Sequence, residues 1–373
     1  MKIVIVGTLP PFRGGIAHFN YTLAKYLSER HEVKGINFTT QYPNVLFPGK
    51  TQFEESTTDS EINQKRLLSS VNPLSWFKTA SEIVNLNPDL IIFKYWMPFF
   101  APAFGTVVKW VKRKTDVKIL VICDNVIPHE NRPFDNKLTR YFFNHVDHFI
   151  VMSEVVKKDL LSLYPRAHYS YAPHPVYNIF GDSIDTNKAR EILGIKSEKV
   201  ILYFGLIRKY KGLDLLIKAA SVLRNKLENF TILIAGECYE DPGKYQALVK
   251  ENELETVVDL KLQFIPDKEV AVYFSAADIV VLPYRSATQS GIVQIAYHFD
   301  RPVIVTNVGG LPEIVPQGDV GYVVEVNDPE AIADALTDFY RNNRYHQMVE
   351  KVREYKKRFS WEEFVKKIEE LVD

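Results

Sequence analysis

Residues 200–214 read Val-Ile-Leu-Tyr-Phe-Gly-Leu-Ile-Arg-Lys-Tyr-Lys-Gly-Leu-Asp, and an amphipathic stretch follows them as far as Leu227. An apolar run rich in β-branched and aromatic residues is typical of a strand that is buried on both faces of a parallel sheet. The stretch after it has the apolar spacing of a helix. These residues predict a strand over 200–204, a basic loop, and a helix over 213–227.

The same pattern recurs along the chain in two series. Strands are predicted over residues 2–6, 33–38, 90–93, 117–122, 148–152 and 168–171, and then over 200–204, 230–235, 260–264, 279–282, 303–305 and 321–324. Helices are predicted over 16–29, 155–163, 213–227, 245–252, 267–276, 289–299 and 329–341. Residues 40–72 are polar, and we expect a long surface excursion there with one short helix at 62–68.

The two series meet at residues 172–181, where two prolines and a glycine favour an extended connection. A chain of 373 residues exceeds the size at which a single hydrophobic core keeps growing. The expected fold class is therefore α/β, with two Rossmann-like βαβ domains that face a central cleft. Ligands of such sheets bind outside the carboxyl ends of the strands, so functional residues should lie on those loops.

Composition excludes several classes of function. Basic and acidic residues number 46 each, so no net charge points to a nucleic-acid partner. Cys123 and Cys238 lie in apolar runs and are predicted to be buried core thiols rather than a disulfide or metal pair. The chain begins directly with a predicted strand, and no apolar run reaches the roughly 18 residues of a membrane span. We therefore expect a cytoplasmic protein.

A glycine-containing loop, Gly-Thr-Leu-Pro-Pro-Phe-Arg-Gly-Gly at 7–15, joins the first predicted strand to the first helix. Glycines let the backbone approach a ligand, and a helix N-terminus offers free N–H groups to an anion. The spacing differs from the dinucleotide fingerprint, and the second strand runs into Asn37-Phe-Thr-Thr, without the acidic residue that a nicotinamide ribose needs. A simple chain reversal is the alternative interpretation.

Two loops of the second series have residue types that suit a phosphate. Arg208, Lys209 and Lys211 form a basic cluster that can neutralise a pyrophosphate; a solvated charge run is the alternative. Ser-Ala-Thr-Gln-Ser-Gly at 286–291 opens a helix with hydroxyl groups and a glycine, and Gly309-Gly310 allows a second close approach. Taken alone, such Ser and Thr residues are ordinary helix caps.

Together these segments resemble the retaining glycosyltransferases of family 4 (glycosyl transferases group 1), which have the GT-B fold. The resemblance spans nearly the whole chain. It rests on Pro-Pro-Phe-Arg-Gly-Gly at 10–15, Gly205 to Gly212, Ala-Asp-Ile-Val-Val-Leu-Pro-Tyr at 277–284, residues 300–306 with Gly309 to Glu313, and Phe-Ser-Trp at 359–361. It implies an acceptor-binding domain of residues 1–174, completed by a C-terminal helix at 359–373 that crosses back, and a nucleotide-sugar domain of residues 175–358.

The resemblance also implies the reaction and its site. A hexosyl group would pass from a nucleotide-sugar to a glycan or lipid-linked acceptor with retention of configuration, without a dissociable metal or other cofactor. The catalytic candidates are Arg208, Lys211, Asp124 and His129. The donor-binding candidates are Gly14, Gly15, Gly205, Glu237, Thr288, Gln289, Ser290, Gly291, Ile292, Val293 and Gln294.

Three positions depart from the family pattern. Leu206 replaces an arginine, and Arg208 is expected to supply that charge. The run Asp-Asn-Val-Ile-Pro-His at 124–129 lacks the usual histidine after its strand, so His129 replaces it or Asp124 orients the sugar. The E-x7-E motif is missing, because its positions fall near Ala287 and at Ile295. An inactive GT-B protein that binds nucleotide-sugar or glycan is therefore the alternative function.

Aromatic residues gather in the acceptor half, at 72–77 and 93–104, and basic ones follow at 109–118. Aromatic and cationic residues together suit a membrane interface, and many family members act on lipid-linked acceptors. A core-facing helix with a solvated basic side explains the same residues. We expect an enzyme of cell-surface polysaccharide or glycolipid synthesis that contacts the inner face of the membrane peripherally.

Overall fold

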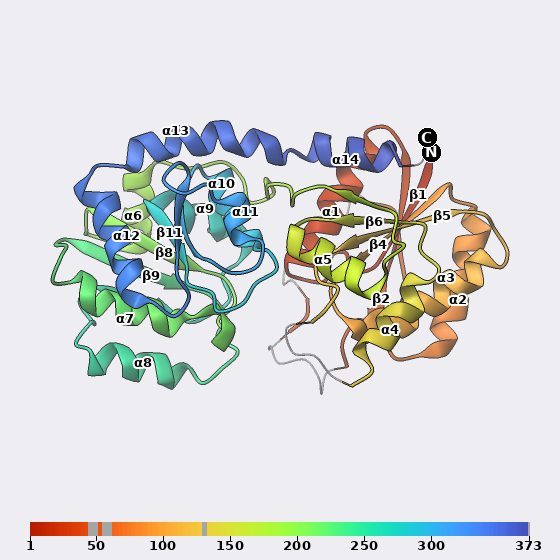
Figure 1. Cartoon of the computed structure of the whole chain (residues 1–373), viewed down its shortest axis with the longest axis horizontal. Coiled ribbons are helices and arrows are strands. Elements are labelled where there is room, and N and C mark those ends of the chain that lie inside the picture. The colour runs from red at the N-terminus through yellow and green to blue at the C-terminus, as the bar shows by residue number, and fades with distance from the viewer. Residues whose placement is uncertain (44–50, 54–61, 129–132, 372–373) are drawn as a thin grey trace. The chain divides into compact units, whose positions relative to one another are not determined.

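The computed structural model describes residues 1–43, 51–53, 62–128 and 133–371 (Figure 1). The chain forms two compact units: an N-terminal unit of Met1–Pro175 with Phe359–Asp373, and a C-terminal unit of Val176–Arg358. Each unit contains one parallel sheet with helices, which is a Rossmann-like arrangement. The predicted α/β fold class is thus confirmed.

The N-terminal unit has a sheet with the strand order β3-β2-β1-β4-β5-β6-β7. The strands are β1 (Lys2–Val6), β2 (Glu32–Thr40), β3 (Gln64–Ser69), β4 (Leu90–Tyr95), β5 (Lys118–Cys123), β6 (His148–Val151) and β7 (Tyr169–Tyr171). The helices are α1 (Gly15–Ser28), α2 (Pro73–Leu86), the 3-10 turn η2 (Pro98–Phe100), α3 (Ala101–Lys112), α4 (Asp135–Phe143), α5 (Glu154–Leu163) and α14 (Trp361–Glu369).

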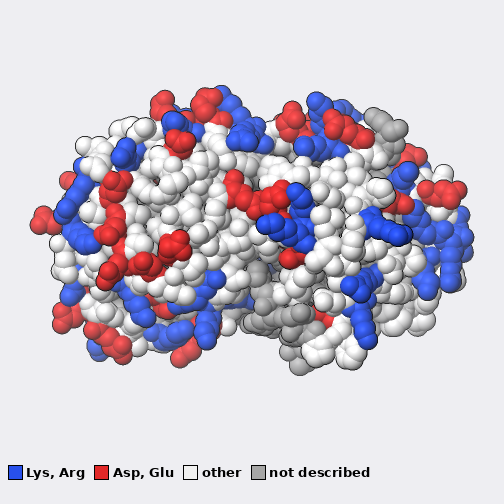
Figure 2. Space-filling view, in the orientation of Figure 1, with Lys and Arg blue, Asp and Glu red and all other residues white. Residues whose placement is uncertain are grey.

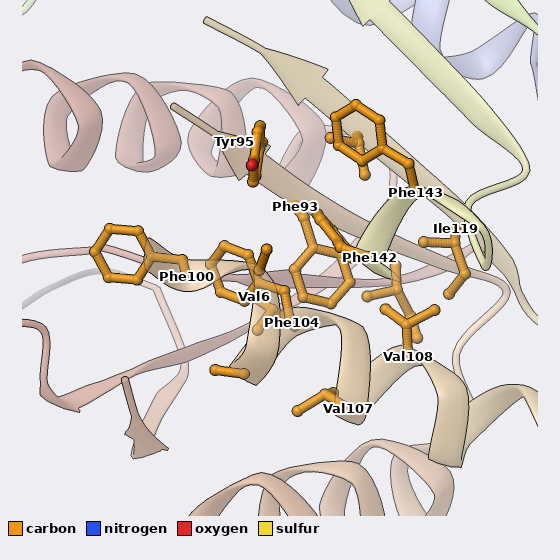
Figure 3. Close-up of a cluster of buried hydrophobic side chains, with 14 of the residues drawn as sticks. Val6, Phe93, Tyr95, Phe100, Phe104, Val107, Val108, Ile119, Phe142 and Phe143 are labelled. Carbon is orange, nitrogen blue, oxygen red and sulfur yellow. The ribbon is translucent and has the colours of Figure 1, made fainter. Parts of the chain in front are cut away.

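The core of this unit contains many aromatic residues, and several of them come from β4, α3 and α4 (Figure 3). Phe93 and Tyr95 of β4 point toward Phe104 of α3 and Phe142 of α4, and all four side chains are fully buried. The ring centroids of Phe93 and Phe104 are 5.1 Å apart. The main aromatic residues of 93–104 therefore belong to the core, and they are unavailable for a membrane interface.

The C-terminal helix α14 belongs to the N-terminal unit, as predicted. Trp361 is 1% exposed, and its ring lies 5.0 Å from that of Phe19 in α1. At the other end of the helix, Glu369 accepts from His31 at 2.7 Å and pairs with Arg30 at 3.0 Å. Ser360 caps the helix by accepting from the Glu363 amide. The apolar contacts fix α14 on α1, and the partly buried contacts of Glu369 support them at the end of the helix.

The C-terminal unit has a sheet with the strand order β10-β9-β8-β11-β12-β13. The strands are β8 (Lys199–Phe204), β9 (Phe230–Ala235), β10 (Val258–Lys261), β11 (Ile279–Leu282), β12 (Val303–Thr306) and β13 (Gly321–Val324). The helices are α6 (Thr186–Leu193), the 3-10 turn η3 (Lys209–Lys211), α7 (Leu213–Leu223), α8 (Pro242–Glu251), α9 (Asp267–Ala276), α10 (Gly291–His298), α11 (Leu311–Ile314), α12 (Pro329–Arg341) and α13 (Tyr345–Tyr355), with a last 3-10 turn η4 (Lys356–Phe359).

Three local predictions are wrong. The short helix at 62–68 is instead strand β3, which pairs with β2 at the edge of the sheet; its polar side chains are tolerated because an edge strand is partly solvated. Strand β10 begins two residues before the predicted 260–264 and ends at Lys261. Cys123 is a buried thiol in β5, but Cys238 lies after β9 in a loop and is only half-buried.

Candidate functional site

The strand order places one site at the carboxyl edge of the C-terminal sheet. The chain progresses from β8 to β9 and β10 on one side, and from β11 to β12 and β13 on the other. The loops after β8 and β11 therefore leave in opposite directions, and ligands of open α/β sheets bind at such a switch point. The basic loop at 205–212 follows β8, and the loop at 283–290 follows β11. The residues that the sequence singled out in these two loops thus lie at this switch point.

Glycine contacts hold these loops against each other. Gly212 has φ +66°, and a Cβ atom there would lie 2.0 Å from the carbonyl oxygen of Pro283. Gly309 has φ +54°, and a Cβ atom there would lie 1.6 Å from the carbonyl oxygen of Ala287. The amide of Gly310 donates to the carbonyl of Thr288 at 3.0 Å. Only glycine permits these approaches, so three loops share one compact edge.

Arg285, in the loop after β11, fixes the basic loop, a role that sequence analysis missed. Its guanidinium group pairs with both carboxylate oxygens of Asp214, at 2.8 and 2.6 Å. It also donates to the carbonyl of Lys209 at 3.0 Å, and its amide donates to the carbonyl of Tyr210. Such a forked arginine contact is geometrically rigid. The side chain of Arg285 is thus engaged in holding the loop.

Lys211 is a partly buried cation of the basic loop. Its Nζ atom lies 5.1 Å from the centroid of the Tyr284 ring, and the residue is half-buried. Burial lowers the pKa of Lys211 below its ordinary value, and the neighbouring charge of Arg208 lowers it further. In the part of the chain that the structure describes, no carboxylate pairs with this ammonium group. A partly desolvated cation of this kind favours an anionic ligand.

Arg208 stands at the start of η3 and is exposed, with its Cζ atom 4.9 Å from the centroid of Tyr239. Tyr239 belongs to the loop after β9. Glu237 is the one residue of this loop that the sequence analysis named as a candidate. That loop is tied to the basic loop through its backbone, because the amide of Ile207 donates to the carbonyl of Glu237 at 2.9 Å. Arg208 and Glu237 are therefore brought to the same edge.

The N-terminus of α10 completes the edge. Ser290 caps the helix by accepting from the amide of Ile292, and Thr288 and Ser290 are buried. Gly291 packs closely on Tyr177, since a Cβ atom would lie 2.9 Å from that ring. Free amides at such a helix start bind anions whatever the side chains are. Gln289 and Ile292 flank this start and are half-buried.

The next turn of α10 is apolar, apart from Gln294. Val293 and Gln294 are fully buried, and Ile295 is 6% exposed. Within the described residues, neither amide atom of the Gln294 side chain has a hydrogen-bond partner. Val293 can therefore contribute to a ligand only through its backbone, whereas Gln294 has unused polar atoms next to the position of the missing glutamate.

The remaining predicted residues lie in the N-terminal unit, also at a carboxyl edge. The loop after β1 is held by Asn37, whose amide donates to the carbonyls of Leu9 and Pro10, and it ends with Gly14 and Gly15 at the start of α1. Asp124 follows β5. His129 lies outside the described residues. The roles of all these residues stay predictions.

Comparison with known proteins assigns the family. Residues 185–359 match "Glycosyl transferases group 1", and residues 13–176 match "Glycosyltransferase Family 4". The chain belongs to the family 4 glycosyltransferases. It has the GT-B fold, since it superposes over its full length on Anabaena HepE in complex with UDP (TM-score 0.81, 16% identity, 99% of that chain). The sucrose-phosphate synthase of Thermosynechococcus elongatus is also similar (TM-score 0.75, 18% identity, 100% of this chain and 98% of that chain).

Relatives in sequence include the D-inositol 3-phosphate glycosyltransferase of Corynebacterium urealyticum, which is 33% identical over 196 residues, or 50% of this chain and 46% of that protein. The N-acetyl-alpha-D-glucosaminyl L-malate synthase of Bacillus anthracis is 26% identical over 377 residues, or 95% of this chain and 92% of that protein. The match thus covers about half the length of the D-inositol 3-phosphate glycosyltransferases, from 38% to 56%, and 92% of the malate synthase.

The burial of Lys211 leads to a prediction about stability. A lysine whose pKa is lowered in the folded state destabilises the fold below its unfolded pKa, because the folded protein must then hold a desolvated charge. We expect Lys211→Met to leave the melting temperature of the ligand-free protein at pH 7 unchanged or higher. The same variant should lose most of the thermal stabilisation that a nucleoside diphosphate gives the wild type. A large drop in the melting temperature of the ligand-free variant would contradict this description of Lys211.

Proposed function

We propose that this protein transfers a hexosyl group from a nucleotide-sugar to a glycan or lipid-linked acceptor, with retention of the anomeric configuration. The observation that supports this most is Lys211, a partly desolvated cation without a carboxylate partner in the described chain, near the N-terminus of α10. When the bond to the donor sugar breaks, negative charge grows on the diphosphate. Preorganised cations and helix amides stabilise that charge without moving.

Arg208 and Lys211 divide this work in the proposed reaction. The guanidinium of Arg208 grips two diphosphate oxygens, and the ammonium of Lys211 acts as a point charge deeper in the loop. The amides at the start of α10 bind the same group, and Thr288, Gln289 and Ser290 offer hydrogen bonds to sugar hydroxyls. The amide of Gln294, whose two polar atoms have no hydrogen-bond partner among the described residues, is the proposed source of a further polar contact to the donor.

The relatives support this class of reaction, but they do not identify the substrates of this protein. The matched proteins of Corynebacterium and Bacillus bear the names of a glycosyltransferase and a glucosaminyl malate synthase, and solved structures of HepE hold UDP or UDP-glucose. We infer a nucleotide-sugar donor from these names and ligands. We also propose that the protein acts in cell-surface polysaccharide or glycolipid synthesis at the inner face of the membrane.

Catalytic inactivity is the second candidate. It is favoured by Ala287 and Ile295, which stand where the family has glutamates, and Ile295 offers no polar atom to a ribose. An inactive protein would bind a nucleotide-sugar or glycan but release no nucleoside diphosphate. Incubation with a panel of nucleotide-sugars distinguishes the two, because an active enzyme hydrolyses its own donor slowly even without an acceptor, whereas an inactive binder only gains thermal stability.

Substitutions in the basic loop test the proposed roles. Removal of one preorganised charge costs roughly 3–4 kcal/mol of transition-state stabilisation, so Arg208→Ala and Lys211→Ala should each lower kcat by about two to three orders of magnitude. Lys209→Ala is the matched control: Lys209 is an exposed cation of the same loop whose backbone, rather than its side chain, binds Arg285. Wild-type turnover in the first two variants, or an equal loss in all three, removes these residues from the site.

Metal independence is expected for the same reason. If lysine, arginine and helix amides stabilise the departing diphosphate, a divalent cation is not needed for it. Transfer measured before and after treatment with a chelator should therefore proceed at the same rate. Strict dependence on added magnesium or manganese would show that the leaving group is stabilised differently.

Peripheral membrane contact is proposed for helices α2 and α3. No described helix is both long and apolar enough to cross a bilayer. Leu74 and Phe77 of α2 are 70% and 41% exposed, and the Phe77 ring lies 5.2 Å from that of Trp110 in α3. Lys114 and the neighbouring Arg113 are exposed beside them. Figure 2 shows basic side chains together at the right-hand edge, where Figure 1 has α2 and α3. Exposed apolar and basic residues together favour an anionic lipid surface.

Vesicle sedimentation measures this contact. The wild type should sediment with phosphatidylglycerol vesicles and much less with phosphatidylcholine ones, and Leu74→Glu/Phe77→Glu should abolish sedimentation. Ile192→Glu is the matched control, since Ile192 lies on α6 and is 57% exposed. Equal sedimentation of the wild type and the double variant would exclude this surface as the contact.

A further inference from the structure

Arg285 and Asp214 form an ion pair between the loop after β11 and the first turn of α7. The guanidinium group contacts both carboxylate oxygens, at 2.8 and 2.6 Å, and the two side chains are 27% and 20% exposed. Burial would raise the pKa of Asp214, but the hydrogen bonds and the charge of Arg285 lower it overall, so the carboxylate is ionised at neutral pH. A two-point contact of this kind fixes orientation as well as distance. The pair is thus a rigid link at the carboxyl edge of the C-terminal sheet.

The remaining contacts of the Arg285 side chain extend this link to two further segments. One nitrogen donates to the carbonyl of Lys209 in the basic loop at 3.0 Å, and Nε donates to Oδ1 of Asn327, in the loop after β13, at 2.9 Å. Together with the two contacts to Asp214 these bonds employ most of the five N–H donors of an arginine. The side chain is therefore committed to the protein rather than to an external anion.

The turn η3 separates the two cations that the proposed function assigns to the diphosphate. Arg208 precedes the turn and Lys211 ends it, and the amide of Lys211 donates to the carbonyl of Arg208 at 2.9 Å. Arg285 holds the residues between them, because its side chain contacts the carbonyl of Lys209 and its amide donates to the carbonyl of Tyr210 at 2.7 Å. A 3-10 turn is short and has weak internal hydrogen bonds, so contacts from outside it decide its rigidity.

We infer that Arg285 is a positioning residue for the proposed diphosphate site, and that Asp214 is its partner in this role. The pair keeps the turn in one shape, so that Arg208 and Lys211 hold their places before a ligand arrives. Charges that are preorganised in this way stabilise an anion without reorganisation of the protein. The inference rests on the proposed function and extends it to two residues that act through the basic loop and do not touch the donor.

The signs of the two charges separate positioning from a direct electrostatic effect. Arg285 is positive and Asp214 is negative, so charge alone would affect an anionic ligand in opposite ways. Loss of Arg285 would weaken the binding of the anion, whereas loss of Asp214 would strengthen it. Positioning predicts the same effect for both, because either substitution releases the turn. Asp214→Asn is therefore the decisive variant, since we expect the removal of a negative charge to weaken the binding of an anion.

Calorimetry with UDP, ADP, GDP, CDP and dTDP measures this effect on binding. For the nucleotide that the wild type binds most tightly, Asp214→Asn and Arg285→Met should each raise the dissociation constant by about 10-fold, as expected when a hydrogen bond to a charged group is weakened. The double variant Arg285→Met/Asp214→Asn should bind no more weakly than the weaker single variant, because the two residues act as one unit. The double variant leaves neither charge unpaired, so it should fold even if a single variant does not.

The conservative variant Arg285→Lys tests whether the positive charge alone is sufficient. Lysine keeps the charge, but its single nitrogen cannot reproduce the planar fork that contacts Asp214 and the carbonyl of Lys209 together. We expect Arg285→Lys to keep most of the wild-type melting temperature and still to bind the nucleoside diphosphate more weakly than the wild type does.

Arg190 provides the matched control for a general loss of stability. It pairs with Asp278 at 2.7 Å, and the two side chains are 14% and 15% exposed. Asp278 directly precedes β11, so this pair lies at the amino edge of the same sheet, opposite to the basic loop. Arg190→Met should lower the melting temperature and leave the dissociation constant of the folded protein unchanged.

The contradicting results are distinct from a failure of the proposed function. Tighter binding by Asp214→Asn, wild-type affinity in folded Arg285→Lys, or an equal loss of affinity in Arg190→Met would overturn the inference. If the wild type binds a nucleoside diphosphate but transfers no sugar, the proposed transfer is wrong, and the dissociation constants still decide the role of Arg285. If the wild type binds none of the five nucleotides, the donor site and the role of Arg285 are both wrong.

Discussion

Close backbone contact between loops is the constraint on which the candidate site depends. The loops after β8, β11 and β12 meet where Gly212 faces the carbonyl of Pro283 and Gly309 faces the carbonyl of Ala287. A Cβ atom at either glycine would overlap that carbonyl oxygen and force the two loops apart. With the loops in contact, Lys211 and the N-terminus of α10 stand at one edge of the sheet. The positions of Lys211 and of the α10 N-terminus thus depend on glycine at positions 212 and 309.

The two units use lysine in opposite ways. Lys94 is buried in β4 and is neutralised within the protein by Asp124 at 2.8 Å. Lys211 is partly buried on a loop, and no described carboxylate neutralises it. The first arrangement balances a buried charge within the protein, whereas the second leaves a partly desolvated cation that favours an anionic ligand.

The fold, and the loops that follow β8 and β11, could be predicted from the sequence, because apolar runs and glycines are local signals. Sequence analysis missed features that depend on distant partners. Arg285 follows an apolar strand without any motif, and only the fold brings it to Asp214. Lys94 stands within a buried strand, where a lysine is unexpected until Asp124 lies beside it. The polar sequence of β3 does not indicate a strand, and a helix was predicted there. The segment is a strand because it pairs with β2 at the edge of the sheet, and that distant pairing leaves no local signal. His129 lies outside the described residues.

The central claim is that a nucleotide-sugar binds at the carboxyl edge of the C-terminal sheet. A crystal structure of the protein soaked with a nucleoside diphosphate measures this most directly. The account predicts density for the diphosphate against the Nζ atom of Lys211, the guanidinium of Arg208 and the amides at the start of α10. Diphosphate density away from residues 205–212 and 286–294, with these residues accessible in the crystal, would contradict it.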